Sequence, residues 1–281
     1  MELYDAIFYR KSIKNYSKKS IKSSLMEEVK YLCSNITYLN KDLNIKAHVV
    51  DRGHLIQFLM GKSCEVKAPH YIVITSNEGD NYLENVGFLA EEIVLKLTSL
   101  GIATCWIKSN LKRDDILEFI DLDKIDIDED DYEKKIEKPC ALIAFGYAEK
   151  EEALFRNINA EPDRKKLKKV CKKIDRKWIK ILNAVRVSPS IKNSQPWVFY
   201  SKDYGFDVYE EKSKKGMEKD SKISMGVALK HFDIACKNFG MDIKFENLNT
   251  KRKMGKDYLI SIINNENNEN LEQNNSWHKY K

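Results

Sequence analysis

Hydrophobic residues recur along this chain at two spacings, one helical and one alternating, and together they predict a mixed fold. The strongest helical pattern covers residues 81–100, NYLENVGFLAEEIVLKLTSL, where leucine, isoleucine and valine fall on one stripe. Gly101 follows this pattern, and a glycine at that place commonly ends a helix in the left-handed conformation. Further helices are predicted over residues 3–10, 24–32, 113–120, 163–185 and 226–240.

Two of these predicted helices carry additional features. Ser24 and Glu27 form the S-x-x-E pattern of a capping box, which predicts where the second helix begins. The segment 163–185 is rich in lysine, yet its apolar residues recur at helical spacing. This pattern predicts one continuous amphipathic helix with a basic outer face.

Runs of β-branched and aromatic residues predict strands at 46–50, 69–76, 102–107, 140–147, 241–246 and 257–265. Residues 197–211, WVFYSKDYGFDVYEE, predict a hairpin that turns near Asp203–Gly205. Trp197, at the start of this hairpin, is expected to pack in the core. Helices and strands that alternate in this way predict the α+β class.

An internal repeat is visible when residues 86–107 are compared with residues 225–246. Gly87 and Gly101 are separated by 14 residues, and so are Gly226 and Gly240. Each pair brackets an amphipathic helix that leads directly into a strand. The repeat predicts two related halves that pack together as an internal dimer.

Composition adds limits to this picture. The 281 residues are 42% hydrophobic, which suits a globular fold, and the net charge of +6 leaves room for an anionic ligand. The six cysteines form no C-x-x-C pair, and Cys105, Cys140 and Cys236 are expected to be buried and reduced. The first residues do not resemble a secretory signal and no apolar run could cross a bilayer, so a cytoplasmic location without membrane contact is expected.

The stretch RKSIKNY near the start offers four side chains that suit a phosphate: Arg10, Lys11, Ser12 and Lys14. A simpler interpretation is that Arg10 and Lys11 complement the C-terminal end of the first helix. The residues alone leave both interpretations open.

The stretch SPSIKNSQPWVF, residues 188–199, differs because two prolines, Pro189 and Pro196, restrict its backbone. Between them Ser190, Asn193 and Gln195 offer hydrogen-bond donors and acceptors on short side chains. A rigid loop of this kind suits the edge of a heteroaromatic ring or a sugar chain.

Together with GIATCWI (101–107) and CALIAFGY (140–147), these stretches resemble the nitroreductase family of FMN-dependent oxidoreductases, over nearly the whole chain to about residue 262. The resemblance implies an α/β sandwich of mixed, mainly antiparallel sheets surrounded by helices. It implies one domain over 1–264, whose halves of about 1–160 and 161–264 form an internal pseudo-dimer. The remaining Asn-rich tail, 265–281, is expected to be disordered.

The resemblance also implies which residues bind FMN. The basic motif of the first half and the proline-bracketed loop of the second would together form one flavin site, so that a monomer would suffice. The backbone after GIATCW would approach the flavin N5 atom. The implied cofactor-binding residues are Arg10, Lys11, Ser12, Lys14, Lys62, Ile107, Lys108, Ser109, Arg164, Lys166, Pro189, Ser190, Ile191, Asn193 and Gln195.

The activity implied is hydride transfer from NADH or NADPH through flavin N5 to an electron-poor small molecule such as a nitroaromatic or a quinone. No catalytic side chain is required. One alternative is a flavin-binding sensor or store with little turnover. Another is a nucleic-acid-binding protein that uses the basic segment 163–185 and the C-terminal tail, although aromatic residues do not line that basic face.

No metal site is expected. The acidic stretch 126–137 matches several positions of a calcium loop, with Glu137 at the last of them. Its sixth position is Asp131, where the sharp turn of such a loop requires glycine. A solvated acidic loop is therefore the expectation.

Overall fold

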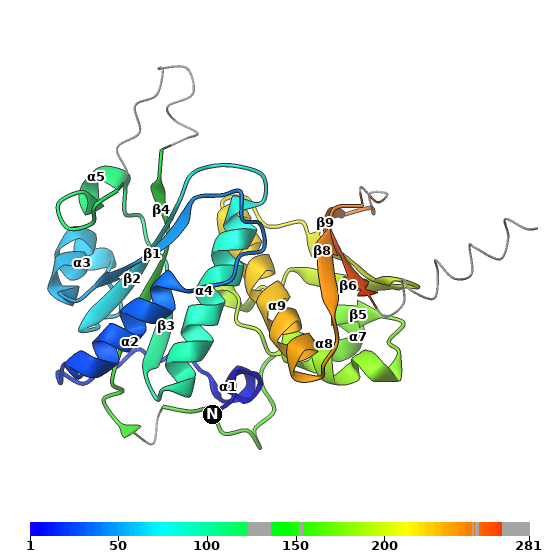
Figure 1. Ribbon diagram of the computed structural model, residues 1–281, viewed down its shortest axis with the longest axis horizontal. Coiled ribbons are helices and arrows are strands. Elements are labelled where there is room, and N and C mark those ends of the chain that lie inside the picture. The colour runs from blue at the N-terminus through cyan, green and yellow to red at the C-terminus, as the bar shows by residue number, and fades with distance from the viewer. Residues whose placement is uncertain (123–135, 152–153, 249, 251–252, 266–281) are drawn as a thin grey trace, which may run out of the picture. The chain divides into compact units, whose positions relative to one another are not determined.

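A computed structural model describes residues 1–122, 136–151, 154–248, 250 and 253–265 of the chain (Figure 1). The chain divides into two compact units, Met1–Ala160 and Glu161–Lys281. In the described part of the chain, no helix combines the length and the apolar character that a membrane crossing requires. The acidic stretch at 126–135 and the tail from residue 266 lie outside the described residues.

The first unit is built on a four-stranded sheet with the strand order β1-β2-β4-β3, and all of its neighbouring strands are antiparallel. Its strands are β1 (Ile45–Val50), β2 (His70–Ser76), β3 (Ala103–Ile107) and β4 (Lys138–Gly146). Its helices are α1 (Leu3–Tyr9), α2 (Ser23–Ser34), α3 (Gly53–Met60), the short 3-10 helix η1 (Gly61–Ser63), α4 (Tyr82–Ser99) and α5 (Arg113–Ile116).

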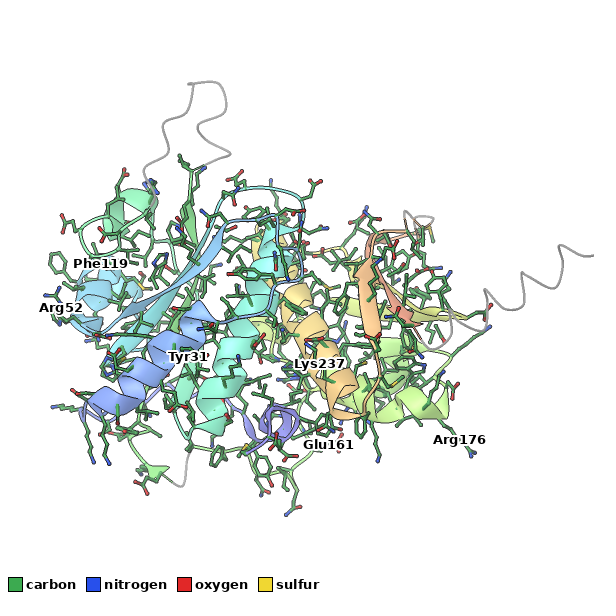
Figure 2. All side chains as sticks on the ribbon, viewed as in Figure 1. Tyr31, Arg52, Phe119, Glu161, Arg176 and Lys237 are labelled. Atoms are coloured by element: carbon green, nitrogen blue, oxygen red, sulfur yellow. The ribbon has the colours of Figure 1, made fainter. Side chains whose placement is uncertain are left out.

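Helices α3 and α4 cover opposite faces of this sheet. Cys105 of β3 packs in a buried cluster with Ile56 of α3, whereas its neighbour Trp106 donates a hydrogen bond to Glu91 of α4 over 3.0 Å. Successive side chains of a strand point to opposite faces, so the two helices are separated by the sheet. Phe119, which Figure 2 shows at the same end of the unit as α3, packs against the cluster of Ile56.

The second unit contains a five-stranded sheet with the order β5-β6-β7-β9-β8, in which only β5 and β6 are parallel among the described pairs. Its strands are β5 (Cys171–Lys172), β6 (Trp197–Lys202), β7 (Gly205–Glu211), β8 (Ile243–Glu246) and β9 (Lys256–Asn264). Its helices are α7 (Leu167–Val170), the 3-10 helix η4 (Arg176–Trp178), α8 (Ile179–Arg186), the 3-10 helix η5 (Ile191–Asn193) and α9 (Glu218–Asn238). Mixed helices and antiparallel strands confirm the predicted α+β class.

Both units repeat one topology. In the first, β1, β2, α4, β3 and β4 follow one another and give the sheet order 1-2-4-3; in the second, β6, β7, α9, β8 and β9 give the corresponding order 6-7-9-8. The register is irregular at corresponding places, between β2 and β4 in the first sheet and between β7 and β9 in the second, where Cys140 of β4 and Leu259 of β9 are extra residues. The sequence repeat therefore reflects two units with the same chain path.

The long helices α4 and α9 also end in the same way. Gly101 and Gly240 adopt positive φ angles of 77° and 67°, as predicted for Gly101. The N–H of the residue after each glycine donates to a carbonyl of the last helical turn over 2.9 Å, Ile102 to Leu97 and Met241 to Cys236. This hydrogen bond is the six-residue closure of a Schellman motif.

The predicted continuous helix over 163–185 is wrong. The segment instead forms α7, strand β5, a turn with Lys173 at φ 60°, the 3-10 helix η4 and then α8. Two interactions explain the interruption. Cys171 and Lys172 pair with Phe199 and Tyr200 of β6, and the Asp175 side chain caps η4 by accepting from the Lys177 N–H over 3.2 Å. A pairing partner 28 residues away thus replaces the local helical hydrogen bonds.

The predicted capping box is also wrong, because α2 begins one residue earlier, at Ser23, with Lys22 at the N-cap and no side-chain cap. Glu27 pairs instead with Lys30 over 3.0 Å.

Three other helices also differ from the prediction. Helix α3 was not predicted, and α9 begins eight residues before the predicted start, at Glu218. In α4, the expected polar face is buried as well, including Glu84, Glu91 and Glu92.

His70, buried at the start of β2, should make stability depend on pH. Burial lowers the pKa of this imidazole, against the opposing effect of a hydrogen bond to the Asp51 carbonyl over 2.8 Å. Its other ring nitrogen accepts from the Ile21 N–H over 3.5 Å, a contact that a second ring proton would oppose. Since the unfolded chain takes up a proton near pH 6.5 and the folded chain does not, stability should fall as the pH drops through that value.

Denaturant unfolding of the parent and of His70→Gln at pH 8 and pH 5.5 would test this expectation. The stability difference between the two proteins should shrink at the lower pH, because only the parent loses the favourable neutral imidazole. An unchanged difference at both pH values would contradict the assignment.

Candidate functional site

Residues 10–16 of the first unit form an extended segment along the edge of its sheet. Ser12 forms a parallel bridge with Thr104 of β3, and the Ile13 N–H donates to the Thr104 carbonyl over 2.9 Å. In extended backbone, side chains two residues apart point the same way. Arg10, Ser12 and Lys14 therefore share one side of the segment, and the intervening Ile13 is buried.

Arg10, Ser12 and Lys14 all influence the ionisation of the Cys105 thiol. Burial raises the pKa of this thiol, while the positive charges of Arg10 and Lys14 and a hydrogen bond with Ser12 act in the opposite direction. A cationic, hydrogen-bonding environment of this kind favours an anion. Cys105 was not among the predicted site residues. It lies in an apolar strand, and the sequence of that strand does not show that the basic segment 10–14 packs beside it.

Arg10 is the notable member of the cluster, since its side chain belongs to a residue that is only 3% exposed. Its guanidinium has one weak contact, from Nη1 to the Ser12 hydroxyl at 3.5 Å, and no carboxylate pairs with it among the described residues. Buried arginine is normally paired. Ser12 and Lys14 are exposed, so the cluster is accessible to a ligand from solution.

The simpler interpretation of Arg10, as a residue that complements the end of α1, involves its backbone only. The Arg10 N–H donates to the Ala6 carbonyl over 2.9 Å and closes the helix. The guanidinium is directed to Ser12 instead. By the same alternation, Lys11 belongs to the opposite side of the extended segment from Arg10 and Lys14.

In the second unit, the proline-bracketed loop between α8 and β6 has an unusual backbone. Lys192, Asn193 and Gln195 have positive φ angles of 52°, 56° and 48°. The Ser190 hydroxyl accepts from the Gln195 N–H over 2.9 Å and closes the loop on itself. This hydrogen bond within the loop adds to the restriction expected from its two prolines.

Two side chains at the ends of this loop are fully buried. Trp197 is packed in the core of the second unit, which confirms its predicted structural role. Ser188 is also buried, and its hydroxyl has no hydrogen-bond partner within the residues that the structure describes.

The side chains of Asn193 and Gln195 bind to the segment 163–165. The Asn193 carbonyl oxygen accepts from Arg164 Nη1 over 2.9 Å, and the Gln195 carbonyl oxygen accepts from the Lys165 N–H over 2.7 Å. Arg164 is one of the predicted cofactor-binding residues, whereas no role was predicted for Asp163 or Lys165. The lysine-rich sequence of 163–169 does not show which of its residues form hydrogen bonds with the loop at 188–195.

The remaining predicted residues are distributed as follows. Lys62 is exposed on η1, and Lys166 is exposed at the N-cap of α7. Ile107 packs against the core cluster of the first unit, and the Ser109 hydroxyl accepts from the Leu111 N–H over 3.1 Å. Lys108 between them is exposed, and Pro189 and Ile191 are partly buried.

Glu137, the last position of the calcium-loop pattern, interacts with side chains of the first unit. Its buried carboxylate accepts a hydrogen bond from Thr75 and lies 3.6 Å from Lys46 Nζ. Burial alone would raise the pKa of this carboxyl, but hydrogen bonds from His48 and Thr75, together with Lys46, lower it below the usual range. The described residues contain no group of three or more potential ligands able to hold a metal ion.

Comparison with known proteins gives one family. Residues 2–236 match the family model described as "Putative TM nitroreductase". Among solved structures, one described as a putative nitroreductase from Thermotoga maritima is 19% identical, covers 92% of this chain and 93% of its own, and has a TM-score of 0.57. That similarity shows a shared fold. No curated protein matches the chain.

Shorter structures also match. An FMN-dependent nitroreductase from Clostridium difficile R20291 is 19% identical over 56% of this chain and 93% of its own, with a TM-score of 0.41. A nitroreductase with bound FMN from Bacteroides fragilis is 17% identical over 58% of this chain and 96% of its own, with a TM-score of 0.43.

Proposed function

Because the chain belongs to the nitroreductase family, we propose that it binds FMN and transfers electrons from NADH or NADPH to an electron-poor small molecule. The membership agrees with the resemblance inferred from the motifs. The observation that carries the proposal is the buried guanidinium of Arg10, which has no acidic partner among the described residues and lies 3.5 Å from the Ser12 hydroxyl.

The residues of this cluster fit the phosphate group of FMN. A guanidinium binds two phosphate oxygens at once through parallel N–H groups, a geometry that no single ammonium can match. The Ser12 hydroxyl adds a neutral donor and Lys14 adds a second positive charge within reach of the same group. A dianionic phosphate would supply the anionic partner that the buried Arg10 lacks within the described part of the chain.

We propose that the proline-bracketed loop contacts the isoalloxazine ring and the ribityl chain. Its backbone is held in one conformation, so that little conformational entropy would be lost when a ligand binds. The buried Ser188 hydroxyl, which has no hydrogen-bond partner among the residues that the structure describes, is a further group that a bound ligand could satisfy. We propose that Pro189, Ser190 and Ile191 contact the flavin, while Asn193 and Gln195 support the loop.

When bound, FMN would supply the redox chemistry by accepting a hydride at N5 and passing electrons on. The chain itself would bind and orient the flavin. The backbone of Ile107, Lys108 and Ser109, at the end of β3, is proposed to face the N5 edge. No protein acid or base is needed for hydride transfer, so it is no obstacle that the described residues place no paired histidine and carboxylate beside Arg10.

Purification of the chain, followed by release and identification of any bound chromophore, tests the proposal. A yellow protein that releases FMN, bleaches with NADH or NADPH and regains its colour with a nitroaromatic or a quinone would support it. A yellow protein that the nicotinamides bleach only slowly would favour a flavin store or sensor. A protein that neither carries FMN nor binds it when it is added would overturn the proposal.

We further propose that one chain suffices to bind FMN, so that the flavin-loaded protein is a monomer. Two-chain flavin sites of homodimers would then be unnecessary. Light scattering of the FMN-loaded protein tests this point: a mass of about one chain (32.8 kDa) with one FMN supports it, and flavin binding that appears only in dimers contradicts it.

A further inference from the structure

The loop between α8 and β6 is attached to the segment 163–165 by hydrogen bonds, some donated by the segment and some by the loop. Arg164 Nε donates to the Ser188 carbonyl over 3.1 Å, and Arg164 Nη1 donates to the Asn193 side chain over 2.9 Å. The Asn193 amide in turn donates to the Asp163 carbonyl over 3.1 Å and to its carboxylate over 3.2 Å. One guanidinium therefore connects the beginning of the loop to its tip.

Lys165 forms a second attachment. Its N–H donates to the Gln195 side chain over 2.7 Å, and its ammonium donates to the Gln195 carbonyl over 2.8 Å. The same ammonium lies 2.8 Å from the carboxylate of Glu211, at the end of β7. Through Lys165 the end of the loop is thus fixed to the sheet of the second unit.

These hydrogen bonds lie at the part of the loop whose backbone conformation is energetically unfavourable. Three residues without a glycine's freedom, Lys192, Asn193 and Gln195, have left-handed backbone angles within four positions. Such angles persist only when surrounding contacts impose them. The hydrogen bonds from Arg164 and Lys165 to Asn193 and Gln195 are contacts of that kind.

We propose that Arg164 is a positioning residue, which holds residues 188–195 in the conformation that binds flavin, and that it is not a ligand of the FMN phosphate. The inference rests on the proposed function. Two of its donors are already committed to Ser188 and Asn193, in directions set by the planar guanidinium. A lysine could not reproduce this pair of hydrogen bonds, because an ammonium lacks the fixed fork.

The affinity for riboflavin, which lacks the phosphate, separates positioning from phosphate binding. Arg164→Ala should weaken FMN and riboflavin by the same factor, about tenfold or more, since it removes two hydrogen bonds from a charged donor. Arg164→Lys should resemble Arg164→Ala. A phosphate ligand would behave differently: the affinity for FMN alone would fall, and Arg164→Lys would restore much of it.

Amide hydrogen exchange of the flavin-free full chain gives a readout that needs no flavin. In Arg164→Ala the peptide covering 188–195 should exchange at least tenfold faster, whereas Lys168→Ala, a change at an exposed lysine of α7, should leave it unchanged. If exchange in the loop stays at the parental rate, Arg164 does not position it and the inference is wrong. If exchange in the loop of Arg164→Ala becomes faster but the parent binds neither FMN nor riboflavin, the proposed function is wrong, while the positioning of the loop by Arg164 is supported.

Discussion

Replacement of Arg10 by alanine is expected to lower the affinity for FMN by roughly 10- to 150-fold. Loss of a hydrogen bond to a charged group costs about 1.5–3 kcal/mol, and the Arg10 guanidinium is buried, where water substitutes for it poorly. The affinity for riboflavin should stay close to that of the parent, because the lost interaction is with the phosphate. Quenching of flavin fluorescence on titration with protein measures both constants.

Matched variants make the result specific. Lys18→Ala removes an exposed positive charge eight residues further along the chain, and it should leave both affinities unchanged. Arg10→Lys should recover part of the FMN affinity, since the charge is kept and the bidentate geometry is lost. Equal FMN affinity in the parent and in Arg10→Ala would remove the observation on which the proposed function depends. The contrast with Arg164→Ala, which should weaken both flavins, distinguishes the two arginines.

Phe232→Ala should destabilise the protein by about 3–5 kcal/mol. Phe232 of α9 is fully buried, and its ring stacks on Phe199 of β6 with centroids 5.6 Å apart and an angle of 6° between the planes. The rings of Phe206 and Trp178 lie 5.7 Å and 5.8 Å from it. Truncation would leave a cavity among large rings of the sheet, α9 and η4 that cannot easily close.

Denaturant unfolding followed by tryptophan fluorescence would measure this loss, since Trp178 lies in the cluster. Phe58→Ala in α3 is the control, because that ring is 85% exposed and its removal should change stability by less than about 0.5 kcal/mol. A small effect of Phe232→Ala would show that the cluster of four rings can repack without it.

Local features of the fold were predictable from the sequence because they depend on neighbouring residues. The periodicity at 81–100 predicted α4, and Gly101 marked its end, since a left-handed residue with the Schellman hydrogen bonds requires only a few adjacent positions. The equal spacing of the two glycine pairs predicted the repeat, which the two sheets show by their common order.

The interruption of the segment 163–185 depended on the tertiary structure. Its apolar residues fit a helix, and the helix fails at Cys171 and Lys172 because β6 offers a parallel pairing partner. A single sequence does not reveal such a partner, since the pairing joins residues 28 positions apart. Burial of the polar side of α4 is likewise a property of what surrounds the helix, as Glu84 and Glu91 show.

The candidate site likewise has features that the sequence predicts and features that depend on the tertiary structure. The sequence by itself determined which chemical groups are present: a basic segment with Arg10, Ser12 and Lys14 at alternate positions, and a loop made rigid by two prolines. Only the tertiary structure decided that Arg10 is buried beside Cys105 without a carboxylate among the described residues, and that Arg164 binds the loop. The physical reason is that a side chain's donors and charge are fixed by its type, whereas its burial and its partners are set by segments that folding brings to it from far along the chain.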